Sequence, residues 1–305
     1  MKVSKQCFAN STKLNNHICL ALMLFLTSVT ASVHAADNHT LQILLHPDEI
    51  FQGDVALLSI SAAQNIRSAS YEWDNQTIDC FYDKEKDAFL GFLPIDLTEP
   101  AGNKALQITI HDNKDRKSTN KIAFKIIEKS FPTQRLTLPE GKVTLSKKDL
   151  VRHNREKARL KKVFNKSIRE KIWKKSFTKP LKGKISTPFG VKRIINNIPK
   201  SSHSGVDLKA PQGAEVVCTS DGIVAFTGDH FFSGNSVFID HGLGIFSMYF
   251  HLSSISVKQG AGIARGQTVG FVGSTGRATG PHLHWGIRIN GQRVEPLSLL
   301  KLFKQ

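Results

Sequence analysis

The sequence predicts a mainly β protein with three parts: an antiparallel, immunoglobulin-like β-sandwich, a basic helical connector and a second antiparallel β domain. Short alternating apolar runs separated by turn residues occupy residues 37–130. A lysine- and arginine-rich stretch with helical spacing of its apolar residues occupies 131–183. Glycine-rich β runs return over 184–305, and a chain of 305 residues is long enough for two domains of ordinary size.

Residues 1–36 are predicted to form a cleaved secretory signal peptide. Three lysines precede the apolar run Ile18–Leu26, and small residues at Val33 and Ala35 provide a cleavage site. The apolar run is too short to cross a bilayer comfortably, which disfavours the alternative of an uncleaved anchor. Cleavage lowers the formal net charge from +17 to +14, because three lysines and no acidic residue are removed.

An exported protein this basic is expected to contact polyanions: anionic lipid surfaces, lipopolysaccharide or a carboxylate-rich cell wall. Nucleic acid is not the expected partner, because export separates the protein from it. Cys80 and Cys218 remain after cleavage. A disulfide between them is permitted in an oxidising compartment, but their placement in different predicted domains favours two buried free thiols.

The N-terminal part, residues 37–130, is predicted to contain six short strands. The turn segments FQGD, WDNQ and HDNKDRKSTN separate them. The strand segments are LQILLH, VALLSIS, SASYEWD, AFLGFLPI, ALQITIH and KIAFKIIE. This part of the sequence has no cluster of metal-ligating or nucleophilic residues, so a structural, targeting or regulatory role is expected.

The connector, residues 131–183, is predicted to be helical and strongly basic. Ser146 is the expected N-cap, and Asp149 lies in the first turn. Across residues 142–184 there are 17 Lys or Arg against 3 Asp or Glu. Apolar residues recur at roughly helical spacing, at Leu150, Leu160, Val163, Phe164, Ile168, Ile172 and Trp173. Two interpretations remain: a solvated helix that only links the domains, or a basic arm that holds the protein on an anionic surface.

The C-terminal part, residues 184–305, is predicted to be all β. The segment AEVVCTSDGIVAF is expected to form a hairpin that turns at Asp221-Gly222. The segment NSVFIDHGLGIFSMYFHLS is expected to form a second hairpin that turns at DHGLG, and QTVGFVGSTG and PHLHWGIRINGQRV supply further strands.

Histidines concentrate in this C-terminal part, where six of the twelve fall between residues 203 and 284. His282 and His284 lie two positions apart on a predicted strand, so both side chains face one side while Leu283 points into the packing layer. A lone histidine is more often a core residue than a ligand. However, His203 and Asp207 together with one of the C-terminal pair would supply the three protein ligands of a catalytic zinc site.

Residues 184–300 resemble the lysostaphin-type (LytM-type) zinc metallopeptidases, which cut peptide bonds in peptidoglycan. The resemblance rests on STPFGVKR, HSGVDLKAPQGAEV, DGIVAFTG, NSVFIDHGLGIFSMYFHLS and GQTVGFVGSTGRATGPHLHWGI, which stand in the family's order. It implies one zinc ion held by His203, Asp207 and His284, with His282 and His251 as the two unliganded histidines of the active site. It also implies peptidoglycan as the substrate and, with the signal peptide, a location in the periplasm or envelope of a bacterium.

The chemistry of these residue types fits that division of roles. Two imidazoles and one carboxylate leave the metal with a net positive charge, which lowers the pKa of a bound water towards roughly 7. A neutral imidazole accepts the proton from that water, and a second donates to the oxygen that becomes negatively charged. We favour His282 as the base and His251 as the donor, although the sequence leaves this order open. A thermolysin-like mechanism is not expected, because the sequence has no His-Glu-x-x-His segment.

Five further positions carry minor predictions. His241 is expected to be structural, and His230 to lie in a surface loop. Phe231 and Phe232 either pack on substrate from that loop or belong to a plain surface turn. Arg193 either contacts a substrate carboxylate or forms a surface ion pair. The segment GSTGRATG lacks the Gly-Lys-Ser/Thr ending of a phosphate loop, so nucleotide binding is not expected.

Two non-enzymatic alternatives remain open. The first is a LytM-like module that activates a separate cell-wall amidase; such modules usually lose zinc ligands, whereas this sequence keeps all three and both companion histidines. The second is a basic protein that docks on polyanions, which accounts for the connector but not for the five site residues. The sequence does not indicate the bond that is cleaved, the oligomeric state or a regulator.

Overall fold

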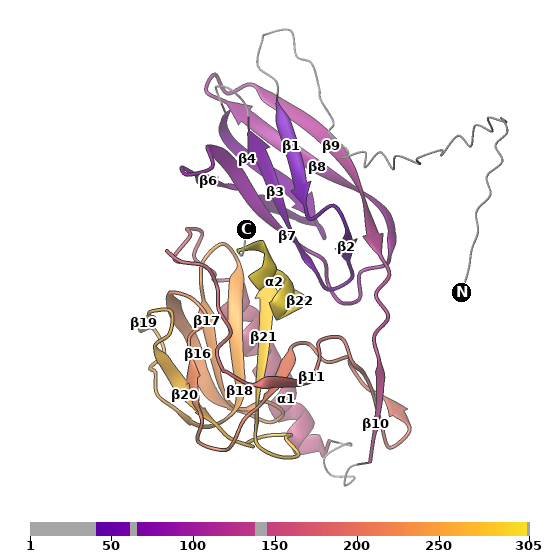
Figure 1. Cartoon of the computed structure of the whole chain (residues 1–305), viewed down its shortest axis with the longest axis vertical. Helices are drawn as coiled ribbons and strands as arrows, with labels where there is room; N and C mark the ends of the chain where they lie inside the picture. Colours follow the sequence, from indigo (N-terminus) through magenta and orange to yellow (C-terminus); the bar gives the residue numbers. More distant parts are fainter. Residues whose placement is uncertain (1–40, 62–65, 138–144, 304–305) are drawn as a thin grey trace, which may run out of the picture.

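The computed structural model describes residues 41–61, 66–137 and 145–303 (Figure 1). The predicted signal peptide lies outside these residues. Across the described ranges there are twenty-two strands and two helices, so the fold is mainly β as predicted. No helix among them is long and apolar enough to cross a membrane.

The N-terminal part consists of two sheets that share one core (Figure 1). One sheet has the order β1-β3-β7-β6, with β1 Gln42–His46, β3 Val55–Ser61, β7 Ala88–Pro94 and β6 Phe81–Asp83. The other has the order β2-β9-β8-β4-β5, with β2 Ile50–Phe51, β9 Lys117–Ile127, β8 Gly102–Asp112, β4 Ile66–Trp73 and β5 Gln76–Asp79.

Alternation of apolar residues explains this shared core. Leu58 of β3 and Tyr71 of β4 are both fully buried in it, because every second side chain of their strands faces inward. All six expected strands are present, and the short strands β2, β5 and β6 were not expected. The pairing of β2 with β9 is parallel.

The described residues of the connector, 131–137 and 145–183, contain one strand and one helix. Strand β10, Thr133–Leu136, pairs in parallel with β12, Lys192–Ile195, which also pairs with β13, Ile198–Pro199. Helix α1 spans Lys147–Phe164, and the predicted N-cap Ser146 accepts the backbone N–H of Asp149 at 3.1 Å. The apolar side of α1 packs against a small buried cluster on the C-terminal sheet, formed by Phe226, Phe238 and Met248.

The predicted continuation of the helix through Trp173 is wrong. Helix α1 ends at Phe164, and Asp240 then accepts hydrogen bonds from Ser167 Oγ at 2.8 Å and from the backbone of Ile168 at 2.9 Å. The remaining chain runs without helix across the C-terminal domain and buries Trp173 and two later apolar residues in its core. Their spacing therefore reflects burial against a neighbouring sheet, not one face of a helix.

The C-terminal part is built on a ten-stranded sheet. Seven of its strands have the order β11-β14-β21-β18-β17-β16-β19, and the other three, β15, β20 and β22, pair off this path. Its strands are β11 Lys184–Thr187, β14 Val206–Lys209, β15 Glu215–Val217, β16 Gly222–His230, β17 Gly234–Asp240, β18 Ile245–Ile255, β19 Gly262–Ile263, β20 Thr268–Val272, β21 His282–Ile289 and β22 Gln292–Val294. Helix α2, Pro296–Leu302, follows these strands, so the prediction that this part is all β is wrong at this point.

Only one of the two hairpins predicted here is present. The hairpin of β17 and β18 forms as expected and turns through DHGLG. The predicted hairpin at Asp221-Gly222 is wrong, because β15 pairs with β20 and β16 pairs with β17. The Asp221 carboxylate instead accepts the backbone N–H groups of Lys174 at 3.1 Å and Arg265 at 2.8 Å, so this turn joins three separate segments.

The N-terminal sheets are joined to the C-terminal domain around α2 and β22 (Figure 1). Arg293 of β22 donates to Asp96 at 2.6 Å, and the backbone N–H of Val55 donates to Ser298 of α2 at 2.9 Å. Phe92 of β7 lies in the same buried cluster as Trp173. The two parts therefore share apolar core and buried polar contacts.

Candidate metal centre

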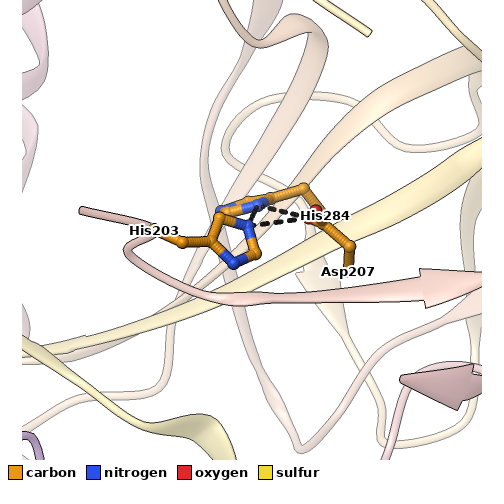
Figure 2. A group of neighbouring side chains, drawn as sticks. All are labelled: His203, Asp207 and His284. Atoms are coloured by element: carbon orange, nitrogen blue, oxygen red, sulfur yellow. Dashed lines mark hydrogen bonds and ion pairs between the residues drawn. The ribbon is translucent and has the colours of Figure 1, made fainter. Parts of the chain in front are cut away.

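His203, Asp207 and His284 come together at the end of the central strands. Asp207 of β14 stands directly opposite His284 of β21 in the register, and His203 lies in the loop before β14. His203 Nε2 is 2.8 Å from Asp207 Oδ1, and His284 Nδ1 is 2.9 Å from the same oxygen. The two imidazole nitrogens are 2.8 Å apart. Figure 2 shows the three side chains pointing toward one another, and all three are buried.

The loop that carries His203 is held by its backbone and by the N-terminal half of the chain. His203 Nδ1 faces the carbonyl oxygen of Pro188 at 2.8 Å. A carbonyl only accepts, so Nδ1 carries the hydrogen and Nε2 of the neutral ring keeps its lone pair for the cluster. The neighbouring Phe189 lies against Gly53 and packs edge-on against Phe131.

Electrostatics keep the cluster in a state that suits a cation. Burial opposes ionisation of Asp207, but its close side-chain interactions with His203 and His284 outweigh burial and hold the pKa of Asp207 far below its usual value. Burial lowers the pKa of His284 to about 4, although Asp207 acts in the opposite direction. Near pH 7 Asp207 is therefore a carboxylate and the His284 ring beside it is neutral.

This donor set fits zinc. Two imidazole nitrogens and a carboxylate oxygen are three of the ligands that zinc uses in catalytic sites. The three donor atoms are 2.8–2.9 Å apart, whereas ligands of four-coordinate zinc at about 2.05 Å lie roughly 3.3 Å from one another. Outward shifts of a few tenths of an ångström would open the cluster to that size.

His251 reaches the same site through a β-bulge. Between the pairs Val237–Tyr249 and Asn235–Leu252, β17 advances two residues while β18 advances three. The extra residue changes the direction of the β18 backbone, and His251 adopts a left-handed conformation with φ 63°. Its ring therefore lies 6.2 Å from that of His284, beside Phe250, whose ring stacks on His284 at 5.2 Å.

His251 and His282 face each other with the same tautomer. Their ring centroids are 4.9 Å apart. His251 Nδ1 lies 2.8 Å from the carbonyl oxygen of Thr275, and His282 Nδ1 lies 2.9 Å from that of Gly280. Each neutral ring therefore keeps its lone pair on Nε2. Burial, together with the charge of His284, lowers the pKa of His251 to about 3. His282 Nε2 lies 3.8 Å from Asp207 Oδ1.

Predictions were also made for His241, His230 and the two cysteines. His241 is fully buried and bonded to the backbone of Asp221 at 2.7 Å and to Ser247 Oγ at 2.8 Å, a structural setting as expected. His230 was predicted in a surface loop, but it ends β16, is buried and stacks on Phe226, because the strand extends further than expected. Cys80 and Cys218 are free thiols, Cys80 half-buried and Cys218 buried.

Arg193 and the phenylalanine pair have specific partners. Arg193 Nη2 lies 3.4 Å from Asp207 Oδ2, so its ion pair is with the metal cluster and not with the surface. Phe232 lies beneath the guanidinium of Arg277, 4.2 Å from the ring centroid, and contacts His153 edge-on. Neither Arg277 nor Phe250 was predicted from the sequence. For Arg277, the available signal was its position close before the His-x-His segment.

One cavity of about 1170 Å³ lies elsewhere in the molecule. It is bounded by α1, β5 and the turn between β21 and β22, and Arg288 and His230 are among its lining residues. None of the three clustered residues lines it. The chemistry of the histidine cluster is therefore separate from this cavity.

Comparison with known proteins places the C-terminal part in one family. Residues 201–296 match the model of Peptidase family M23. The DD-carboxypeptidase/endopeptidase Mpg of Neisseria meningitidis serogroup B is 46% identical over 116 residues, which are 38% of this chain and 27% of that protein. The peptidoglycan DD-endopeptidase ShyA of Vibrio cholerae is 40% identical over 117 residues, again 38% of this chain and 27% of that protein. The match thus spans about a quarter of each relative's length.

A solved structure extends the likeness beyond this domain. The crystal structure of a candidate peptidase M23 from Pseudomonas aeruginosa superposes with a TM-score of 0.65 and 28% sequence identity. The superposition covers 83% of this chain and 95% of that one. The likeness in fold therefore extends beyond residues 201–296 into the rest of the chain.

Proposed function

We propose, on the premise that residues 201–296 are a Peptidase family M23 domain, that this protein is a zinc-dependent endopeptidase that hydrolyses peptide bonds of peptidoglycan stems or cross-links. The observation that carries this proposal is the convergence of His203, Asp207 and His284 with two further histidines beside them. The name of the relative ShyA supplies peptidoglycan as the substrate class, and the names of both ShyA and Mpg supply endopeptidase activity.

The three clustered side chains would hold one zinc ion. When bound, zinc supplies a water of lowered pKa and polarises the scissile carbonyl. The Pro188 carbonyl fixes the tautomer of His203, so its Nε2 is ready to bind without reorganisation. The stacked ring of Phe250 fixes the plane of His284 and keeps solvent from that side.

Hydrogen bonding favours exchanging the roles that sequence analysis gave the two companion histidines. His251 is buried, and its Nδ1–H donates to the carbonyl oxygen of Thr275. This hydrogen bond leaves the lone pair of Nε2 available to accept a proton, as a general base must. His282 is less buried than His251, and its Nε2 lies 3.8 Å from Asp207 Oδ1, on the side of the cluster from which it would donate to the carbonyl oxygen as that oxygen gains charge. We therefore propose His251 as the base and His282 as the donor.

The setting of the enzyme is proposed from charge and composition. An exported protein in the periplasm or envelope of a bacterium would meet peptidoglycan directly. The outward side of α1 carries exposed basic side chains, which supports contact with an anionic envelope surface. These residues are Lys147, Lys148, Arg155, Lys157, Arg159, Lys161 and Lys162.

Digestion of purified sacculi tests the function. The zinc-loaded protein is expected to release fragments cut within their peptides, identified by mass spectrometry, and a chelator or Asp207→Asn is expected to stop the release. If peptides stay intact and only sugar–peptide amides are lost once an amidase is added, the alternative of an amidase activator replaces this proposal.

A further inference from the structure

The cavity of about 1170 Å³ lies outside the proposed metal centre and is built from distant parts of the chain. Its walls are strand β5 of the N-terminal sheets, one side of α1, the segment that follows α1, and the turn between β21 and β22. Ligand pockets in proteins commonly have volumes of roughly 300–1,000 Å³, so this cavity has room for a small molecule.

Positive charge is in excess on these walls. Two acidic side chains, Asp79 and Glu156, also line the cavity, but Glu156 already forms an ion pair with Arg152 at 2.7 Å. Within the described residues no carboxylate lies within ion-pair distance of any of the four cationic side chains that line it. These four are Lys157, Lys161, Arg169 and Arg288.

Part of this charge is gathered beside an aromatic ring. Lys157 and Lys161 are four positions apart on α1, and Phe164 follows three positions later, so the three side chains lie along one side of the helix. Arg288 of β21 lies over the Phe164 ring, with its guanidinium carbon 5.2 Å from the ring centroid. Lys161, Phe164 and Arg288 therefore form one wall, with two positive charges next to an apolar face.

Arg288 keeps unused hydrogen-bond donors in this wall. Its one hydrogen bond to the described residues runs from Nη1 to the carbonyl oxygen of Gly291 at 2.8 Å, whereas a guanidinium has several N–H groups. Burial and the positive charge of Arg293 lower the pKa of Arg288, but a guanidinium stays charged at neutral pH. A ligand that supplies negative charge and acceptor oxygens would therefore be stabilised here.

A second wall carries a buried histidine with an unsatisfied nitrogen. His230 is only 5% exposed and lines the cavity at the end of β16, where its ring stacks on Phe226. Its Nδ1 is buried and has no hydrogen-bond partner among the described residues. A buried polar atom without a partner is costly, so a polar group of a ligand at this wall would offset that cost.

The rest of the lining is largely apolar and defines the ligand further. Ile78, Leu160, Ile168 and Leu243 line the cavity together with the Phe164 ring. A complementary ligand therefore has an apolar body as well as an anionic group. Among common anions, a phosphate monoester suits several unpaired cations best, because it has a charge of about −1.5 to −2 near pH 7 and three acceptor oxygens. A carboxylate has a single charge and fewer oxygens.

We propose that this cavity is a binding site for a small amphipathic phosphate monoester, with its phosphate held by Arg288 and Lys161 and its apolar body against Phe164. The site is separate from the metal centre, and the proposal does not depend on the proposed peptidase activity. Two sources share this chemistry: a phosphorylated lipid, whose acyl chains form the apolar body, and a water-soluble phosphate ester with a small apolar group.

Calorimetric titration of the full protein with probes that stay monomeric in water tests the site. The lipid probe is dihexanoyl phosphatidic acid and the soluble probe is phenyl phosphate. Dihexanoylglycerol and phenol are their matched partners without phosphate, and inorganic phosphate is the anion without an apolar body.

The variants remove single positive charges. Arg288→Gln and Lys161→Gln change the wall of the cavity. Lys162→Gln is the matched control, because it removes the same charge from the next residue of α1, which is exposed and does not line the cavity. Thermal melts verify that each variant is folded, and Lys161→Gln decides the outcome if Arg288→Gln is not.

The wild-type protein and Lys162→Gln are expected to bind a phosphate ester about 10–100-fold more tightly than its partner without phosphate, the scale of hydrogen bonds to charged groups. Arg288→Gln is expected to lose most of that preference. Lys161→Gln should weaken binding of the ester by about 2–5-fold, the scale of an exposed ion pair. Tighter binding of the phosphatidic acid or of phenyl phosphate identifies the source of the ligand.

Three results would overturn the proposal. The first is equal binding of the probes with and without phosphate. The second is binding of inorganic phosphate as tightly as both esters, because the apolar walls would then contribute nothing. The third is equal affinity of Lys161→Gln, Arg288→Gln and Lys162→Gln for the esters, which would place the phosphate elsewhere on the basic surface. Absence of zinc-dependent cleavage of sacculi would overturn the proposed function and leave this site intact.

Discussion

His251 occupies a backbone conformation that few residues other than glycine adopt. Its φ of 63° lies in the left-handed region, within a strand that otherwise keeps extended geometry. For most side chains this conformation costs about 1–2 kcal/mol. The bulge that imposes it turns the His251 ring toward His284, so the strain accompanies the placement of the proposed base.

Replacing His251 separates the strain from the chemistry. We expect His251→Asn and His251→Ala both to bind zinc and to lose activity by about 10²–10⁴-fold, because the proton acceptor is gone. Asparagine tolerates left-handed φ better than alanine, so His251→Asn should be the more stable of the two. Activity on sacculi and urea unfolding measure the two effects. Retention of near-normal activity by either variant would remove His251 from the mechanism.

Asp207 Oδ1 lies 2.8 Å from His203 Nε2 and 2.9 Å from His284 Nδ1, and the charge of Asp207 makes the site attractive to a cation. We expect Asp207→Asn to weaken zinc binding by more than the roughly 10–100-fold typical of outer-shell partners, because a direct ligand loses its charge. Calorimetric titration with a competing chelator measures this loss. Asp229→Asn, which changes an exposed carboxylate paired with Arg152, is the control and should bind zinc normally. Equal affinity in both variants would contradict the ligand assignment.

Residue spacing predicted that His203 and Asp207 meet one histidine of the C-terminal pair, and the family resemblance added which one and named His251, but neither predicted how the side chains are oriented. His282 and His284 share a face of β21, with Leu283 buried behind them, because strand periodicity is two. The bulge at His251 leaves no such pattern, since an extra residue in one strand is visible only when its partner is known. Arg277 was missed for the same reason: its place beside Phe232 depends on contact between two loops.

Among the elements, the connector differs most from its prediction. Its first half is helical because a capped, periodic segment packs apolar residues on one side. Its second half has similar spacing but lies on the C-terminal domain, where Trp173 contacts Phe81 and Phe177 among other aromatic rings. Sequence periodicity cannot distinguish burial against a helix face from burial against a sheet, because both show recurrent apolar residues.

This difference predicts unequal effects of mutation along the connector. Trp173→Ala is expected to destabilise the protein by about 3–5 kcal/mol, because a large buried ring leaves a cavity between the two halves. Val151→Ala, at an α1 position that is 68% exposed, should change stability by less than about 0.5 kcal/mol. The free energy of unfolding in urea measures both. A small effect of Trp173→Ala would mean that the second half of the connector is only loosely attached.

At the scale of the whole molecule, the N-terminal sheets support the metal centre from a distance. Gly53 lies against Phe189, and the preceding Pro188 carbonyl fixes the tautomer of His203. Strand patterns predicted the sheets themselves, since each buries alternate residues. They did not predict this contact or the joint at α2, because both depend on how separately folded layers meet. The immunoglobulin-like character of the N-terminal part, its domain limits and its role remain predictions.

The joint between the two halves has a pH-sensitive ion pair. Burial alone would raise the pKa of Asp96, but hydrogen bonds from Arg293 and Thr98 outweigh it and lower the pKa to about 2 from the ordinary 3.8. Because the folded pKa lies below the unfolded one, the stabilisation is fully present above about pH 4 and is lost as pH falls through 2. The difference corresponds to about 2 kcal/mol, at roughly 1.4 kcal/mol for each pKa unit.

Asp96→Asn tests whether this pair holds the halves together. The variant keeps the shape of the side chain but cannot ionise, so it should be about 2 kcal/mol less stable than the wild type at pH 7. That deficit should shrink steadily between pH 4 and pH 2, where the wild-type carboxylate also becomes neutral. Urea midpoints across this range measure the deficit. The control is Asp115→Asn, at an exposed ion pair with Arg67, which should change the free energy of unfolding by less than about 0.5 kcal/mol. If the free energy of unfolding of Asp96→Asn and of the wild type changed with pH in parallel, the ion pair would add nothing to stability. The shared apolar core around Phe92 and Trp173 would then be the contact that joins the halves.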